Sequence, residues 1–142
     1  VLTDIWSVHN YTQEKDRLID ELKITEGQEP YRNSRDKKYL AVYEGQPYML
    51  DEFGGIPWMA ATDRNNSWGY GGMPKDEEAF YQRLEGQIDA LIASKHVCGF
   101  CYTQLTDVEQ EKNGVYYYDR RPKLDMKRIK AIFEKIPSRP AK

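Results

Sequence analysis

The sequence predicts an α/β fold built from three strand–helix units in succession. Three short apolar runs, at residues 4–10, 48–52 and 97–105, are each followed by a segment with apolar residues at helical spacing. Such alternation predicts parallel strands joined by right-handed crossovers. The strands are apolar on both sides, which predicts a sheet with a covering layer on each face. With 142 residues, the chain is long enough for one core, and we assign residues 1–142 to a single unit.

The first unit has a strand at residues 4–10 and a helix over about residues 14–23. Thr12 is the predicted N-cap of this helix. The polar segment 25–38 contains Gly, Pro, Asn and Ser, and it is predicted to form a surface loop.

The second unit has a strand at residues 48–52, entered from Pro47, and then a loop at residues 54–74 that starts with two glycines. A structureless loop of this length in a compact domain is usually functional or disordered. Its large aromatic residues, which are Trp58, Trp68 and Tyr70, favour an ordered loop. A helix is predicted from Pro74 to about Ser94, with acidic residues in its first turn.

The third unit has a strand at residues 97–105, a loop at residues 106–114 and a final helix at about residues 125–135. The strand contains Cys98 and Cys101, whose spacing is typical of a redox motif or of half a metal site. No second Cys or His pair completes a site, so we expect buried structural thiols, no metal and no cofactor.

Composition excludes some classes of partner and favours others. The net charge of −2 gives no strong attraction to nucleic acid or to membranes, and no apolar run is long enough to span a bilayer. Aromatic residues make up 13% of the chain, and surplus Tyr and Trp suit faces that bind sugars or proteins. The chain starts at Val1 without a signal peptide, so we expect a piece of a longer protein and leave its cellular location open.

Glu52 is the first candidate for a catalytic residue. It ends a buried strand and precedes a glycine pair, which is where α/β barrels place catalytic carboxylates. The alternative is a solvated strand end before a turn. Tyr11 and the loop after residue 105 follow the other two strands, and parallel strands bring such ends to one side of the sheet.

Three motifs together resemble the C-terminal portion of a glycoside hydrolase family 2 barrel, closest to the bacterial β-galactosidase-like branch. They are Asp-Glu-Phe-Gly-Gly at 51–55, Trp-Gly-Tyr-Gly at 68–71 and Tyr-Thr-Gln-Leu-Thr-Asp-Val-Glu-Gln-Glu-Lys-Asn-Gly at 102–114. The resemblance covers nearly the whole chain. It implies that the three units are strands six to eight, with their helices, of a TIM (β/α)₈ barrel.

The resemblance also implies a retaining, exo-acting β-glycosidase that hydrolyses an O-glycosidic bond of a carbohydrate substrate with two carboxyl groups. By position in the motifs, Glu52 is the implied nucleophile, with Asp51 where the family usually has Ser. Tyr11 is the implied hydrogen-bond partner that orients it. The further residues implied to bind substrate are His9, Trp68, Asn113 and Tyr102, the last in place of a usual Trp.

Two departures from the family pattern limit this reading. In glucuronidases of the family an Asn and a Lys two positions apart read the sugar carboxylate, whereas this chain has Lys112 directly before Asn113, so glucuronide specificity is not inferred. The chain also lacks the Asn-Glu pair of the family's acid/base, which we expect upstream of Val1. Residues 1–142 alone are therefore expected to be nearly inactive and to self-associate through open barrel edges.

Two other functions stay open at the level of sequence. The chain is alternatively a stand-alone carbohydrate-binding or protein-interaction module that uses Trp58, Trp68 and Tyr70. A thiol-redox role for Cys98 and Cys101 is the third hypothesis.

Overall fold

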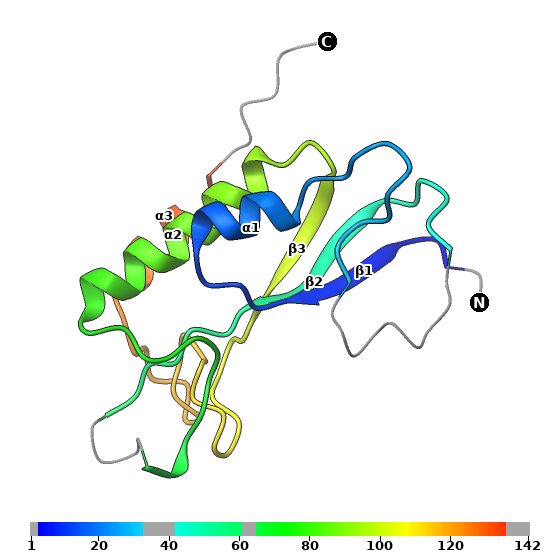
Figure 1. Cartoon of the computed structure of the whole chain (residues 1–142). Helices are drawn as coiled ribbons and strands as arrows, with labels where there is room; N and C mark the ends of the chain where they lie inside the picture. The colour runs from blue at the N-terminus through cyan, green and yellow to red at the C-terminus, as the bar shows by residue number, and fades with distance from the viewer. Residues whose placement is uncertain (1–2, 33–41, 61–64, 136–142) are drawn as a thin grey trace.

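The computed structural model describes residues 3–32, 42–60 and 65–135, and these form a three-stranded parallel sheet with three helices (Figure 1). The strand order β1-β2-β3 follows the sequence, as expected for consecutive right-handed units. The elements are β1 (Trp6–Asn10), α1 (Lys15–Glu21), β2 (Tyr48–Gly54), α2 (Glu77–Ala93), β3 (Val97–Thr103) and α3 (Met126–Phe133). The predicted α/β class and the three units are confirmed.

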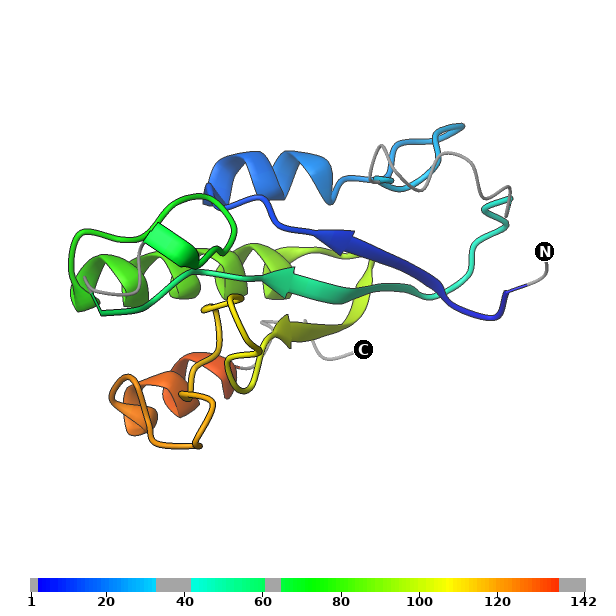
Figure 2. The ribbon, with the colours of Figure 1, turned by 90° about the horizontal axis from the view of Figure 1, so that it is seen from below.

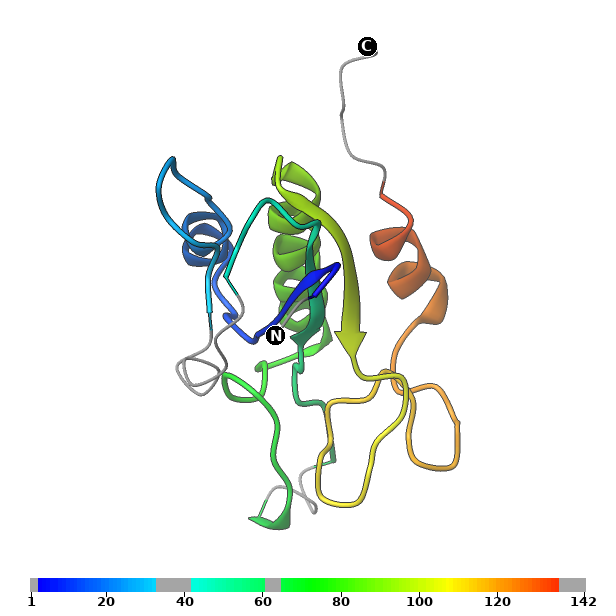
Figure 3. The ribbon, with the colours of Figure 1, turned by 90° about the vertical axis from the view of Figure 1, so that its right-hand side faces the viewer.

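The helices lie on one face of the sheet only. Figure 1 shows all three to the left of the strands, and Figure 2 shows α1 near β1, α2 behind the centre and α3 near β3. Seen from the opposite side, the strands lie in front of α2 with no helix over them (Figure 3). The prediction of a covering layer on both faces is therefore wrong for the described residues. Burial along β1 alternates strictly, from buried Trp6 to exposed His9, as in a strand with one covered face.

The core lies between the covered face and α2. Leu50 and Phe53 of β2 and Leu84 and Ile88 of α2 are completely buried. Each such side chain contributes about 1.5–3 kcal/mol when it leaves water, so this layer accounts for much of the fold's stability. The apolar positions that predicted the helix are the positions that pack here.

The helix ends follow local capping chemistry. Asp76 caps α2 by accepting a hydrogen bond from the Ala79 amide at 2.7 Å, and Asp125 caps α3 in the same way. The prediction of Thr12 as the N-cap of α1 is wrong, because Glu14 occupies that position. The longest helix, α2, has 17 residues, and within the described ranges no helix is both long and apolar enough to cross a membrane.

The cysteines are not buried, which corrects the prediction of structural core thiols. Cys98 and Cys101 are both free and exposed on β3. They are accessible because β3 is the last strand of the described sheet and one face of that sheet carries no helix. The predicted loop at residues 25–38 is described only as far as residue 32.

Candidate active site

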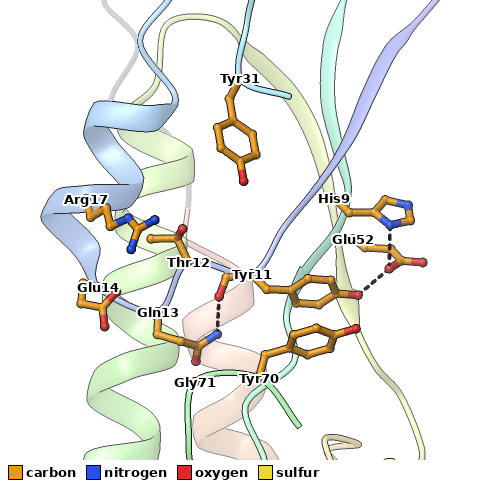
Figure 4. Close-up of a pocket in the computed structure, with 10 residues that line it drawn as sticks. All are labelled: His9, Tyr11, Thr12, Gln13, Glu14, Arg17, Tyr31, Glu52, Tyr70 and Gly71. Atoms are coloured by element: carbon orange, nitrogen blue, oxygen red, sulfur yellow. Dashed lines mark hydrogen bonds and ion pairs between the residues drawn. The ribbon is translucent and has the colours of Figure 1, made fainter. Parts of the chain in front are cut away.

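A pocket of about 570 Å³ lies beyond the ends of β1 and β2 (Figure 4). Its walls include His9 from β1, Tyr11 and Gln13 from the segment after β1, Glu52 from β2, and Tyr70 from the loop before α2. The predicted nucleophile, its predicted partner and one predicted substrate-binding residue therefore line one cavity. Their placement follows from the parallel order of the strands, which brings successive strand ends together.

A bulge in β2 places Glu52 on the open face of the sheet. Val8 pairs with Leu50, but the next residue of β1, His9, pairs with Glu52, so Asp51 is an extra residue on β2. In a regular strand, Glu52 would share the buried face of Leu50. Because of the extra residue, Glu52 instead lies beside His9, and Phe53 returns to the core. Bulges of this kind often re-aim a side chain next to an active site.

Two side chains contact the same oxygen of the Glu52 carboxylate. The Tyr11 hydroxyl donates a hydrogen bond to Oε2, and Nδ1 of His9 lies 3.1 Å from that atom. The other carboxylate oxygen points away from both residues in Figure 4. The Glu52 side chain is 41% exposed, so this second oxygen faces accessible space. The arrangement anchors one oxygen and leaves the other without a bond to either residue.

Burial and the bond to Glu52 raise the pKa of the Tyr11 phenol above its ordinary value, with burial as the larger cause. Tyr11 therefore keeps its proton and stays a donor to the carboxylate at neutral and mildly alkaline pH.

A polar network fixes the segment after β1 that carries Tyr11. Asn10 is buried; its side chain accepts from the Thr12 amide and donates to Glu21 of α1, both at 2.9 Å. The Gln13 amide nitrogen donates to the carbonyls of Tyr11 and Gly54 at 2.8 and 2.7 Å. This segment therefore joins β1, α1 and the end of β2. The sequence pattern did not predict a function for Asn10 or Gln13.

Tyr102 and Asn113 lie outside this pocket. The Tyr102 ring packs edge-on against Phe53 and Phe133 and covers Gly54, where a Cβ would overlap it. Asn113 is fully buried, and its side chain bonds Gln104 at 2.8 Å and Glu111 at 2.9 Å. The geometry gives both a packing function, and their predicted contact with substrate stays a prediction.

The three aromatic residues of the long loop do not form one flat binding face. Trp58 is partly buried against Phe80, and Tyr70 is stacked on Tyr11. Trp68 is 49% exposed and contacts Tyr70 edge-on at 5.7 Å. The binding-module alternative gains no support from this arrangement. Trp68 touches the pocket residue Tyr70 but is not part of the pocket lining, and its predicted contact with substrate stays a prediction.

A buried ion pair ties the loops after β2 and β3 together, and no sequence motif predicted it. Nζ of Lys123 lies 2.5 Å from Oδ1 of Asp107, and it also donates to the carbonyls of Trp58 and Lys112 at 2.7 and 3.2 Å. The Gly114 amide donates to the same carboxylate at 3.1 Å. Both charged side chains are at most 2% exposed. The pair thus organises the loops beside the pocket.

Metal ligands are not grouped in the part of the chain that the structure describes. None of its His, Cys, Asp and Glu side chains form a set of three or more that suits a metal ion. The chemistry of the pocket is that of a carboxylate with a phenol and an imidazole beside it.

Alkaline pH is expected to destabilise the fold through its buried tyrosines. Burial raises the pKa of Tyr11, Tyr48 and Tyr102 above the ordinary 10.0. Above about pH 10 the unfolded chain releases tyrosine protons that the folded chain retains. The contribution of these tyrosines to the free energy of unfolding should therefore be constant near neutral pH and should fall as the pH rises above about 10. Urea unfolding between pH 8 and 11 measures this.

The matched variant for that experiment is Tyr48→Phe. The Tyr48 hydroxyl is buried and has no hydrogen-bond partner among the described residues, so its removal should not lower stability at pH 7. It should reduce the alkaline slope by about 1.4 kcal/mol per pH unit. If the fall in the free energy of unfolding with pH is the same in Tyr48→Phe as in the parent, the raised pKa of Tyr48 is not one of its causes.

Comparison with solved structures identifies a common fold. No family model and no curated protein sequence matches this chain at a significant level. Ruminococcus gnavus β-glucuronidase matches with a TM-score of 0.59 at 18% identity, over 92% of this chain and 22% of that chain. A GH2 β-galacturonidase from Eisenbergiella tayi, bound to galacturonate, matches with a TM-score of 0.58 at 18% identity, over 92% and 24%. Bifidobacterium dentium β-glucuronidase, complexed with coumarin-3-O-glucuronide, matches with a TM-score of 0.58 at 16% identity, over 98% of this chain and 22% of that chain.

These matches establish that nearly the whole chain has the fold of a segment of such glycosidases. They support the resemblance to glycoside hydrolase family 2 drawn from the motifs. The chain spans less than a quarter of the length of each of these three structures.

Proposed function

We propose that this chain is the nucleophile-bearing part of the catalytic barrel of a retaining, exo-acting β-glycosidase of glycoside hydrolase family 2. The observation that carries the proposal is the Glu52 carboxylate in the pocket lining, with one oxygen bonded to Tyr11 and close to His9 while the other points away from both. In this proposal the strands are the sixth to eighth of a TIM barrel, and the open face of the sheet is part of the barrel's inner wall.

In the proposed first step, the open oxygen of Glu52 attacks the anomeric carbon of the sugar. The bond to the leaving oxygen breaks, and that oxygen takes a proton from an acid/base carboxyl group elsewhere in the protein, about 5 Å from Glu52. In the second step, water gives a proton to the same group and attacks the anomeric carbon, which releases Glu52 as a carboxylate. The sugar keeps its configuration because it is inverted twice.

Tyr11 and His9 hold the carboxylate for this attack. Fixing one oxygen limits rotation of the carboxylate, so the other stays directed at the sugar. When the glycosyl ester has formed, Oε2 becomes its carbonyl oxygen, and the Tyr11 hydroxyl remains bonded to it. His9 lies on the open face, where it also reaches towards sugar hydroxyls.

We favour a β-galactoside-like substrate over a uronide. Lys112 and Asn113 occupy the region in which glucuronidases of the family read the sugar carboxylate. Here Nζ of Lys112 faces Asp107 at 4.0 Å, and Asn113 is buried in its own loop. Neither side chain points into the pocket beside Glu52.

Covalent trapping in the full-length protein tests the proposed function. A 2-deoxy-2-fluoro-β-galactosyl fluoride, and the matching glucuronyl reagent, should slow both steps but let the first proceed because fluoride leaves readily. We expect one sugar per chain, with the label on the peptide that contains Glu52. A label on another residue, or hydrolysis of aryl β-glycosides without any trapping at Glu52, would refute the proposal. Residues 1–142 alone should show little hydrolysis and should self-associate in sedimentation.

A further inference from the structure

Tyr70 lines the pocket, and its ring packs against the ring of Tyr11. The two rings are stacked face to face, with centroids 3.5 Å apart and planes 3° from parallel (Figure 4). Tyr11 follows β1, whereas Tyr70 belongs to the loop that precedes α2, so the contact joins two separate strand–helix units. The Tyr70 hydroxyl also adds to the raised pKa of Tyr11, after burial and the hydrogen bond to Glu52.

The end of β2 holds Tyr70 in this position. The Tyr70 amide donates to the carbonyl of Gly55, and the Gly55 amide donates to the carbonyl of Thr103, both at 2.9 Å. Trp68 contacts the Tyr70 ring edge-on. Tyr70 is thus fixed through its backbone to Gly55, which is itself bonded to β3, and through its ring to Tyr11.

Gly55 leaves the space that the two rings occupy. Its φ of +60° is in the left-handed region, and a Cβ at this position would overlap the Tyr70 ring and lie 3.0 Å from two carbons of the Tyr11 ring. The absence of a side chain at Gly55 therefore allows the Tyr11 and Tyr70 rings to stack, and the backbone that follows Glu52 determines where both rings lie.

We propose that Tyr70 is a positioning residue for the glycosidase reaction, because its ring holds the Tyr11 phenol in the plane from which the hydroxyl reaches Oε2 of Glu52. This inference rests on the proposed function. Without a flat partner, the Tyr11 ring is free to turn out of that plane into the pocket. Tyr70 then acts on the nucleophile only through Tyr11.

The test is a double-mutant cycle in the full-length protein. Replacing Tyr70 by Leu should lower kcat on an aryl β-galactoside about tenfold, because a tenfold change in rate corresponds to the stabilisation that one aromatic pair contributes. It should lower the rate of covalent trapping by the same factor. KM should change less than kcat. In the Tyr11→Phe background the same replacement should have almost no effect, because no hydroxyl remains to be positioned.

Three further variants make the cycle decisive. Tyr70→Phe keeps the ring and should restore most of the activity, and Tyr70→Met fills the same space without a flat face if the Leu variant does not fold. Tyr118→Leu is the matched control, since Tyr118 is 75% exposed and lies outside the pocket, and it should keep the parent kcat.

Contrary results are distinguishable. An equal loss of kcat in the parent and Tyr11→Phe backgrounds would overturn the positioning role, as would a rise in KM at constant kcat, which marks direct substrate binding. If the parent protein neither hydrolyses the panel of β-glycosides nor is trapped at Glu52, the proposed function fails. If the parent is trapped and Tyr70→Leu is trapped at the same rate, only this inference fails.

Discussion

Glu52→Gln is expected to lower kcat of the full-length protein by about 10⁴-fold or more, because an amide cannot form the glycosyl ester. The replacement keeps the size of the side chain and leaves an amide oxygen to accept from Tyr11, so the fold should be unchanged. Steady-state kinetics on an aryl β-galactoside and on the corresponding glucuronide measures the loss, and the melting temperature checks the fold.

Asp51→Asn is the matched control for this variant. Asp51 is the neighbouring residue in the bulge, and its Oδ1 lies 3.7 Å from Nε2 of His9. At 3.7 Å this contact is too long for a hydrogen bond, so the loss should be severalfold at most. Glu52→Ala with added azide should regain turnover and yield the glycosyl azide of inverted configuration. Full activity of Glu52→Gln, or an equal loss for Asp51→Asn, would contradict Glu52 as nucleophile.

Lys123→Met is expected to destabilise the protein by about 3–5 kcal/mol, because the buried Asp107 carboxylate loses its hydrogen-bonded cation and keeps only Lys112, whose Nζ is 4.0 Å away. It also removes the donor to the carbonyls of Trp58 and Lys112. Urea unfolding at pH 7 measures the change. Because the pair ties together the two loops beside the pocket, kcat should fall as well.

The double variant Asp107→Leu with Lys123→Met tests whether the cost comes from the unpaired charge. Replacing both partners by apolar residues should cost much less than the sum of the single changes. Arg121→Met is the control, since it breaks an exposed pair with Asp119 at 2.7 Å and should change stability little. Additive losses in the double variant would refute a coupled buried pair.

The elements that the sequence predicted well are those governed by local pattern. The apolar stripe and the acidic first turn of α2, and the apolar spacing of α3, predict helices within a few residues of their observed bounds. The strand ends were less certain, and β2 continues past Glu52 to Gly54. Glu52, Tyr11 and His9 were found by position at strand ends and by resemblance, and the structure places all three at one pocket.

The remaining features depend on contacts between distant parts of the chain. The exposure of Cys98 follows from which face of the sheet is covered, and the burial of Asn113 follows from how its loop closes. The Tyr70 stack and the Asp107–Lys123 pair join residues from separate loops. No periodicity records such pairings, because each depends on how separate segments pack.

By itself, the sequence determined the order of strands and helices, the parallel sheet and the identity of the carboxylate at the end of β2. Hydrophobic spacing acts over a few positions, so it can be recognised in the chain. Only the tertiary structure decided that a bulge at Asp51 turns Glu52 to the open face, and that Tyr11, His9 and Tyr70 gather around it. Strand register and loop packing set these positions, and both arise from the assembled sheet.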